Sequence, residues 1–182
     1  RFFCMSSNPS PSPLLSSADI QLDRDIFLRA LLRELSGTLE NVVGLDDASG
    51  FISVVGQRVG EWIEAEYRTV LGSSPMDREQ VTEVLIDLKR RIHGDFYVVE
   101  ADDTKIVLGN RACPFGDKVL GRSSLCMMTS NVFGTIAAQN LGRAKVVLRK
   151  TIAKGSATCQ VVLHLKPGAE ADAEDGREYF RI

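Results

Sequence analysis

The sequence predicts an α+β fold in which helices pack on a small antiparallel sheet, with the element order α-α-α-β-β-α-β-β. Three observations lead to this prediction. Apolar residues recur at helical spacing from Asp23 to Gly94, the pattern then changes to that of strands, and one further helical segment separates two strand pairs. Each strand pair is joined by a short turn, which predicts antiparallel hairpins.

The chain of 182 residues is long enough for one domain with its own core. Residues 1–22 form a leader rich in proline and serine that we expect to be flexible, residues 23–166 form the single domain, and residues 167–182 form an acidic tail that we expect to be frayed. Because a methionine follows the opening RFFC, we interpret residues 1–4 as lying ahead of the natural start, and Cys4 is set aside.

The first helix is predicted from Asp23 to Gly44, and the second from about Asp47 to Leu71. Small residues recur along one face of the second helix, at Ser49, Ser53, Gly56 and Gly60. Such residues let another backbone approach closely. This face therefore either packs on another helix of the same chain or forms a homodimer interface.

The third helix has the clearest boundaries. Ser74 is predicted as its N-cap, with Pro75 at the first helical position and Asp77 in the first turn. Gly94 is predicted to end it.

Two hairpins and a fourth helix complete the domain. The first hairpin joins residues 95–101 to 104–110 through two aspartates, and the second joins residues 143–152 to 157–165 around the sequence AKGS. Between them, a helix is predicted over residues 124–140.

Composition narrows the classes of partner. The net charge is −2 and the pI is near 5.8, so no basic field recruits nucleic acid or an anionic membrane. No apolar run approaches the roughly 18–20 residues that span a bilayer. With only four cysteines, a disulfide-stapled secreted scaffold is not expected. We therefore expect a cytoplasmic protein that binds neither nucleic acid nor membrane.

Signatures of known enzyme classes are missing from the sequence. It contains no GxGxxG after a strand, no Walker loop, no HExxH and no GxSxG. His93 and His164 are the two histidines, and His93 falls near a predicted helix end, where a capping role is expected. We expect no catalytic residues and no enzymatic activity.

Three cysteines occupy loops or element ends. Cys113 precedes Pro114 in a loop, Cys126 lies in the first turn of the fourth helix, and Cys159 opens the last strand. We expect the helix N-terminus to lower the pKa of the Cys126 thiol. Three thiolates suit zinc or an iron–sulfur cluster, although the spacing contains no CxxC pair. The alternative is that these are ordinary buried cysteines.

Two long stretches carry a resemblance to a known family. These are FLRALLRELSGTLENVVGLDDASGFISVVGQRVGEWI and CPFGDKVLGRSSLCMMTSNVFGTIAAQNLGRAKVVLRKTIAKGSATCQVVL. The chain resembles the methanogen output domain family, a prokaryotic signalling domain found alone or joined to sensory and receiver modules. It is more distantly similar to vinyl-four-reductase and heme–nitric-oxide-binding types of ligand-sensing domain. Such modules often carry a further cysteine where this chain has Arg149, Lys150 and Thr151.

The resemblance implies a signal-transducing sensory or output domain. In this interpretation, a ligand or a redox event at Cys113, Cys126 and Cys159 repacks the fourth helix against the sheet, and a homodimer or a signalling-protein partner receives the change. The cofactor is not identified by the sequence; an iron–sulfur cluster and zinc are both considered.

Two other functions remain open. A small organic molecule without metal could occupy an apolar pocket lined by Phe115, Leu125, Met128 and Phe133. Alternatively, the domain could be a protein-interaction module that binds no ligand.

Overall fold

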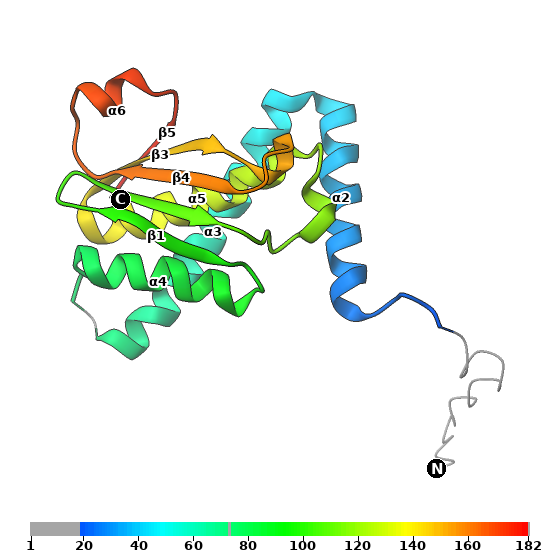
Figure 1. The fold of residues 1–182 in the computed structure, drawn as a ribbon, viewed down its shortest axis with the longest axis horizontal. Helices are drawn as coiled ribbons and strands as arrows, with labels where there is room; N and C mark the ends of the chain where they lie inside the picture. Colours follow the sequence, from blue (N-terminus) through cyan, green and yellow to red (C-terminus); the bar gives the residue numbers. More distant parts are fainter. Residues whose placement is uncertain (1–18, 73, 182) are drawn as a thin grey trace, which may run out of the picture.

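The fold was analysed in a computed structural model that describes residues 19–72 and 74–181. Five antiparallel strands form one sheet in the order β1-β2-β4-β3-β5, and the long helices α3, α4 and α5 lie over one of its faces (Figure 1). The helices are α2 (Arg24–Val43), α3 (Leu45–Leu71), α4 (Arg78–Arg91), α5 (Ser123–Leu141) and α6 (Ala169–Ala173), with short 3₁₀ turns η1 (Gly116–Val119) and η2 (Ile152–Lys154). The strands are β1 (Phe96–Ala101), β2 (Lys105–Asn110), β3 (Arg143–Lys150), β4 (Cys159–His164) and β5 (Arg177–Phe180).

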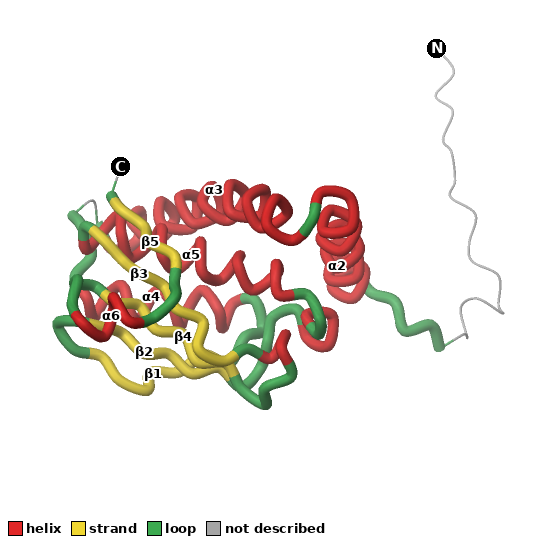
Figure 2. The backbone as a smooth tube through the Cα atoms, turned by 90° about the horizontal axis from the view of Figure 1, so that it is seen from above, coloured by secondary structure: helices red, strands yellow, loops and turns green. Residues whose placement is uncertain are grey.

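The predicted fold class and element order are confirmed. Three helices, a hairpin, the helix α5 and a second hairpin follow one another as expected. The helix α5 lies against the sheet, and α3 packs on the other side of α5 (Figure 2). The core joins these layers through fully buried side chains, among them Leu85, Ile106, Phe133, Ile136 and Leu163.

The small residues of α3 pack within the chain. A Cβ atom added at Gly56 would lie 2.6 Å from the Cβ of Asn131, and one added at Gly60 would lie 2.9 Å from the Cβ of Thr135. Both partners belong to α5. Since this face of α3 is covered by α5, the interpretation as intrachain packing is confirmed, and the face is not available as a homodimer interface.

The helix α4 begins later than predicted. Its N-cap is Asp77, whose Oδ1 accepts a hydrogen bond of 2.8 Å from the Gln80 backbone N–H, while Gln80 Oε1 accepts one of 3.1 Å from the Asp77 backbone N–H. This reciprocal pair is a capping box. The prediction of Ser74 as the cap is wrong because a carboxylate and a glutamine three residues apart satisfy two backbone N–H groups at once.

The acidic tail is not frayed. Residues 177–180 form β5, which pairs with β3 and extends the sheet. The ring of Tyr179 lies against the backbone of Gly134 in α5, where an added Cβ would be 2.1 Å from the ring. The segment before β5 covers the second face of the sheet, where Lys105 and Arg149 form ion pairs with Glu170 at 3.1 and 3.0 Å.

The helix α2 contributes little to the core. Its only buried residues are Ser36 and Gly37. Arg33 attaches the helix to the loop before α5 by donating hydrogen bonds of 2.6 and 2.8 Å to the carbonyls of Lys118 and Leu120. The apolar side chains that predicted the helix are largely exposed: Phe27, Leu28, Leu31, Leu32, Leu35 and Val42.

Within the described residues, no helix combines the length and apolar character that crossing a membrane requires. The leader, predicted as residues 1–22, lies mostly outside the described residues.

The contact between α3 and α5 predicts opposite effects for two glycine substitutions. Gly56→Ala should lower the free energy of unfolding, because overpacking costs about 1–3 kcal/mol and exceeds the gain of up to about 1 kcal/mol in helix propensity. Gly50→Ala is the matched control. It lies on the same helix with open space at its Cβ position and should raise the free energy of unfolding. Urea denaturation of both variants checks this, and equal effects would contradict the packing.

Candidate functional site

All three cysteines line one small pocket, which we call the thiol pocket. Its volume is about 30 Å³. Cys113 comes from the loop after β2, Cys126 from the first turn of α5, and Cys159 from the start of β4. The remaining walls are formed by Phe96, Pro114, Phe115, Val119, Leu125, Thr129, Leu148, Thr151 and Val161. The structure therefore brings together three thiols that are far apart in the sequence.

Local hydrogen bonds hold two of the cysteines in place. The carbonyl of Cys113 accepts a bond of 2.8 Å from the backbone N–H of Gly116, which closes a turn after Pro114. The Sγ of Cys159 accepts bonds from the backbone N–H of Ile152 at 3.3 Å and from the side-chain amide of Asn110 at 3.7 Å. These two donors fix the position of the Cys159 sulfur in the pocket.

A buried lysine from α4 reaches the same region. The Nζ of Lys89 donates a hydrogen bond of 2.8 Å to Thr129 Oγ1, and it lies 5.5 and 5.1 Å from the ring centroids of Phe96 and Phe133. Burial lowers the pKa of Lys89 to about 8, while the charges of the three cysteines act in the opposite direction. Among the described residues, no carboxylate oxygen lies within 4.0 Å of this ammonium.

Burial keeps two of the three thiols, Cys113 and Cys126, protonated. It raises the pKa of Cys113 and raises that of Cys126 to about 11. The nearby Lys89 charge and a favourable interaction with Thr151 lower the pKa of Cys126, but they are smaller effects. The expectation that the helix N-terminus leaves Cys126 with a low pKa is therefore wrong, because desolvation of the thiolate outweighs it.

The metal prediction is not tested by the positions of the thiols alone. Among the described residues, no group of three or more histidine, cysteine, aspartate or glutamate side chains stands in an arrangement that holds a metal ion. A metal at Cys113, Cys126 and Cys159 would require the thiols to draw together. His164 is not a fourth ligand, because it lies on the opposite face of the sheet and shares a hydrogen bond of 2.8 Å with Glu174.

The four residues predicted to line an organic-ligand pocket do not all line the same pocket. Phe115 and Leu125 line the thiol pocket. Phe133 is fully buried in the core, with its ring edge-on to Phe96 at 5.4 Å, and Met128 faces α3 near Gly56. A volume of about 30 Å³ is far below the roughly 300 Å³ at which small-molecule sites begin, so the thiol pocket as it stands is too small for such a ligand.

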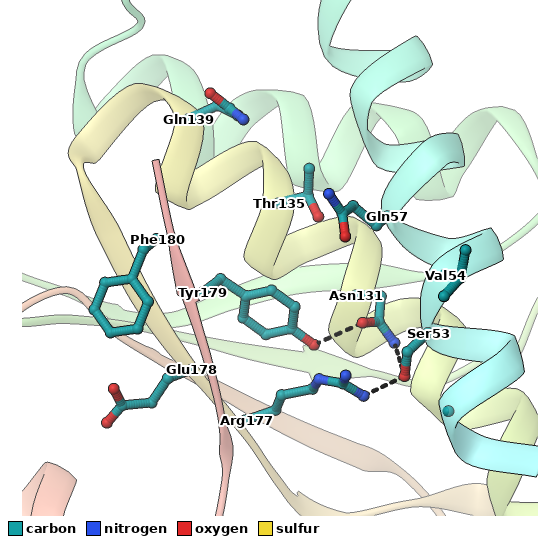
Figure 3. A pocket seen from close by; sticks show the side chains of 11 residues that line it. Ser53, Val54, Gln57, Asn131, Thr135, Gln139, Arg177, Glu178, Tyr179 and Phe180 are labelled. Carbon is teal, nitrogen blue, oxygen red and sulfur yellow. Dashed lines mark hydrogen bonds between the residues drawn. The ribbon is translucent and has the colours of Figure 1, made fainter. Parts of the chain in front are cut away.

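Sequence reasoning missed a second and larger cavity, which we call the polar cavity. It has a volume of about 320 Å³ and lies between α3, α5 and β5 (Figure 3). Its polar lining includes Ser53, Asn131, Thr135, Arg177 and Tyr179. The available signal was the pair Asn131 and Thr135, four residues apart on one face of a helix, together with the strand-like alternation of REYF in the supposed tail.

Comparison with known proteins decides the family. The family model described as Methanogen output domain 1 matches residues 31–164, which is most of the chain. The chain belongs to this family. The resemblance inferred from the two quoted stretches is thus confirmed. In this methanogen output domain, residues 165–182 follow the matched range. No curated protein matches the chain.

Two solved structures show the same fold at low sequence identity. The phenol-responsive sensory domain of the transcription activator PoxR, solved with phenol, matches with a TM-score of 0.60 and 16% identity, covering 85% of this chain and 81% of that one. A trafficking protein particle complex subunit 3 from Naegleria fowleri, covalently bound to palmitic acid, matches with a TM-score of 0.55 and 13% identity, covering 78% of this chain and 96% of that one.

The uncompensated charge of Lys89 predicts a stability effect with a defined pH dependence. At pH 7, Lys89→Met should raise the free energy of unfolding by on the order of 1–3 kcal/mol, because it removes a buried charge without a carboxylate partner. The folded-state pKa of Lys89 is lowered to about 8 from 10.5, so the unfolded chain binds more protons between these values. Wild-type stability relative to the variant should therefore recover as the pH rises from 8 to 10.5.

Denaturation of both proteins across this pH range measures the effect. Lys166→Met, at an exposed position, serves as the control and should leave the pH dependence unchanged. A Lys89→Met protein that is less stable than wild type at every pH would contradict an uncompensated charge.

Proposed function

We propose that this methanogen output domain acts as a sensory module in signal transduction and that the thiol pocket receives its signal. The observation that carries the proposal is the convergence of three thiols and an ammonium without a carboxylate partner at the start of α5. The fold shared with the PoxR sensory domain supports a sensory role. We propose no catalytic role and a cytoplasmic location, where thiols stay reduced.

The charges in the pocket favour an occupant that replaces thiol protons. Three thiolates and one divalent cation carry a net charge of −1, which the ammonium of Lys89 balances. Thr151 also lines the pocket, and its hydroxyl interacts with the Cys126 thiol.

The size of the pocket restricts the occupant further. About 30 Å³ is roughly a tenth of the volume at which small-molecule sites begin, so an organic occupant would require the walls to open. Oxidation by peroxide is disfavoured, because thiols whose pKa is raised by burial supply little thiolate at neutral pH. We therefore propose a single thiophilic metal ion, with zinc as the probe, at Cys113, Cys126 and Cys159.

The helix α5 would carry the signal. Cys126 lies in its first turn, and further along the helix packs on α3, β3 and β5. Drawing Cys126 toward Cys113 and Cys159 would move this first turn relative to the sheet. Because α5 is closely packed on both sides, such a shift favours a discrete second arrangement over gradual deformation.

Zinc binding tests this proposal directly. Protein purified without oxygen should bind one zinc ion per chain and release protons in calorimetry, because the thiols are protonated beforehand. Single changes of Cys113, Cys126 or Cys159 to serine should each weaken binding by more than about tenfold. Cys4→Ser is the matched control and should bind zinc like the wild type.

If the wild-type protein neither retains nor binds zinc, the proposed metal site is wrong. If the serine variants then altered stability alone, the interaction module without a ligand would replace the sensory proposal.

We further propose that the partner is a second copy of the chain, held through the exposed apolar side of α2. Phe27, Leu31 and Leu35 are spaced four residues apart and are 54%, 42% and 58% exposed. Within residues 19–72 and 74–181, no other segment covers these three side chains, and α2 has only two buried residues.

Sedimentation analysis distinguishes a homodimer from a domain that binds another signalling protein. The double variant Leu31→Lys and Leu35→Lys should convert a dimer into a monomer without lowering the melting temperature of the domain. The control pair Glu34→Lys and Asp25→Lys changes charge on the same helix without removing apolar surface. A wild-type monomer at high concentration would favour a signalling-protein partner instead.

A further inference from the structure

The polar cavity is built from two buried side chains and a strand that the chain adds at its end. Ser53 of α3 and Asn131 of α5 are 5% and 2% exposed and form the inner wall (Figure 3). The strand β5 forms the opposite wall with Arg177 and Tyr179. Beside Gly50, a Cβ atom would meet nothing within 4 Å, so this end of the cavity is open.

A hydrogen-bond network holds the inner wall rigid. The Asn131 side-chain nitrogen donates to the Met127 carbonyl at 2.6 Å and to Ser53 Oγ at 3.3 Å. The Asn131 side-chain oxygen accepts a bond of 3.2 Å from the Tyr179 hydroxyl. Ser53 Oγ itself donates to the Ser49 carbonyl at 2.6 Å. Because every member has a partner, the wall is preorganised and does not need to rearrange around a ligand.

Arg177 supplies the charge of the cavity. Strand alternation directs Arg177 and Tyr179 toward α3 and α5, while Glu178 points away (Figure 3). The Glu178 carboxylate pairs with Arg143 at 3.3 Å. The Arg177 guanidinium donates to Ser53 Oγ, and within residues 19–72 and 74–181 it forms no ion pair with a carboxylate.

We propose that the polar cavity binds a small organic carboxylate. The carboxylate would bind the Arg177 guanidinium, and the hydrocarbon part would lie along Val54 toward the open space beside Gly50. A planar guanidinium with free N–H groups matches the geometry of a carboxylate. A volume of about 320 Å³ lies at the lower end of the range for small-molecule sites, which restricts the ligand to a small one.

The lining favours a carboxylate over a phosphate. One guanidinium is the only cationic side chain in the lining, and the other polar groups there are neutral amides and hydroxyls, apart from the Glu178 carboxylate that is turned toward Arg143. The cavity also lies beyond the first turns of α3 and α5, so neither helix N-terminus contributes N–H donors to a phosphate. One guanidinium neutralises only one of the two negative charges of a doubly charged phosphate.

This site is distinct from the thiol pocket, because the two share no lining residue. Both contact α5, one at its first turn and one along its middle. The polar cavity therefore adds a second input to the helix that the proposed function assigns to signal transmission, and its test does not depend on the cysteines.

Matched pairs of acids and amides test the proposal on the full chain. Butyrate and benzoate are titrated at constant ionic strength against butyramide and benzamide, which have the same shape without the charge, and inorganic phosphate is titrated separately. Amide resonances of Ser53, Asn131, Thr135 and Tyr179 are followed by NMR. At least one acid should shift these resonances with saturation, and its amide should bind at least about tenfold more weakly, as expected for loss of a charged hydrogen-bond partner.

Two variants test whether Arg177 provides the positive charge that binds the acid. Arg177→Gln should weaken binding of the acid by at least about tenfold, whereas Arg58→Gln, at an exposed position on α3 outside the lining, should leave it unchanged. If Arg177→Gln does not fold, the comparison of acids with amides on the wild type still decides. Equal binding of acid and amide, tighter binding of phosphate, or no shift with any acid would overturn the proposal.

Discussion

The close packing of α5 between the sheet and α3 is the constraint on which the other features depend. Both sides of this helix are covered, so its residues must be apolar, small or hydrogen-bonded. On the side of α3 this requirement appears as Gly56 and Gly60, and on the side of β5 as Gly134 beneath the Tyr179 ring. The same packing makes α5 the one element that reaches the thiol pocket at its start and the polar cavity along its middle.

Burial determines the chemistry at both places, but with opposite results. In the thiol pocket, removal from water raises the pKa of the Cys113 and Cys126 thiols and lowers that of the Lys89 ammonium, which has no carboxylate partner among the described residues. In the polar cavity, the buried Asn131 and Ser53 satisfy one another, and the charge lies at the rim on Arg177, where water reaches it. We propose a bound cation for the first arrangement and a bound anion for the second.

The sequence predicted the fold well because periodicity records which faces are covered. The two hairpins and α5 were predicted from this periodicity. The packing of α3 follows from its small residues, because these allow another helix to approach closely. The sequence suggested a site formed by Cys113, Cys126 and Cys159, and the structure brings these three thiols into one pocket. It did not reveal Lys89, which is one basic residue among Lys89, Arg90 and Arg91 at a helix end, a position where charges are normally solvated. It also misjudged the pKa of Cys126, because the desolvation that raises it comes from residues distant in the chain.

The strand β5 lies outside residues 31–164, the part of the chain that matches the family. The matched region therefore contains four strands of the sheet, the thiol pocket and the inner wall formed by Ser53 and Asn131, while β5 contributes the guanidinium. Within β5 the two roles fall on different residues: Tyr179 packs on Gly134 and against the core, whereas Arg177 supplies the charge of the polar cavity. Under the carboxylate proposal, a change of Arg177 alone would therefore alter what the cavity recognises and leave the packing of Tyr179 in place.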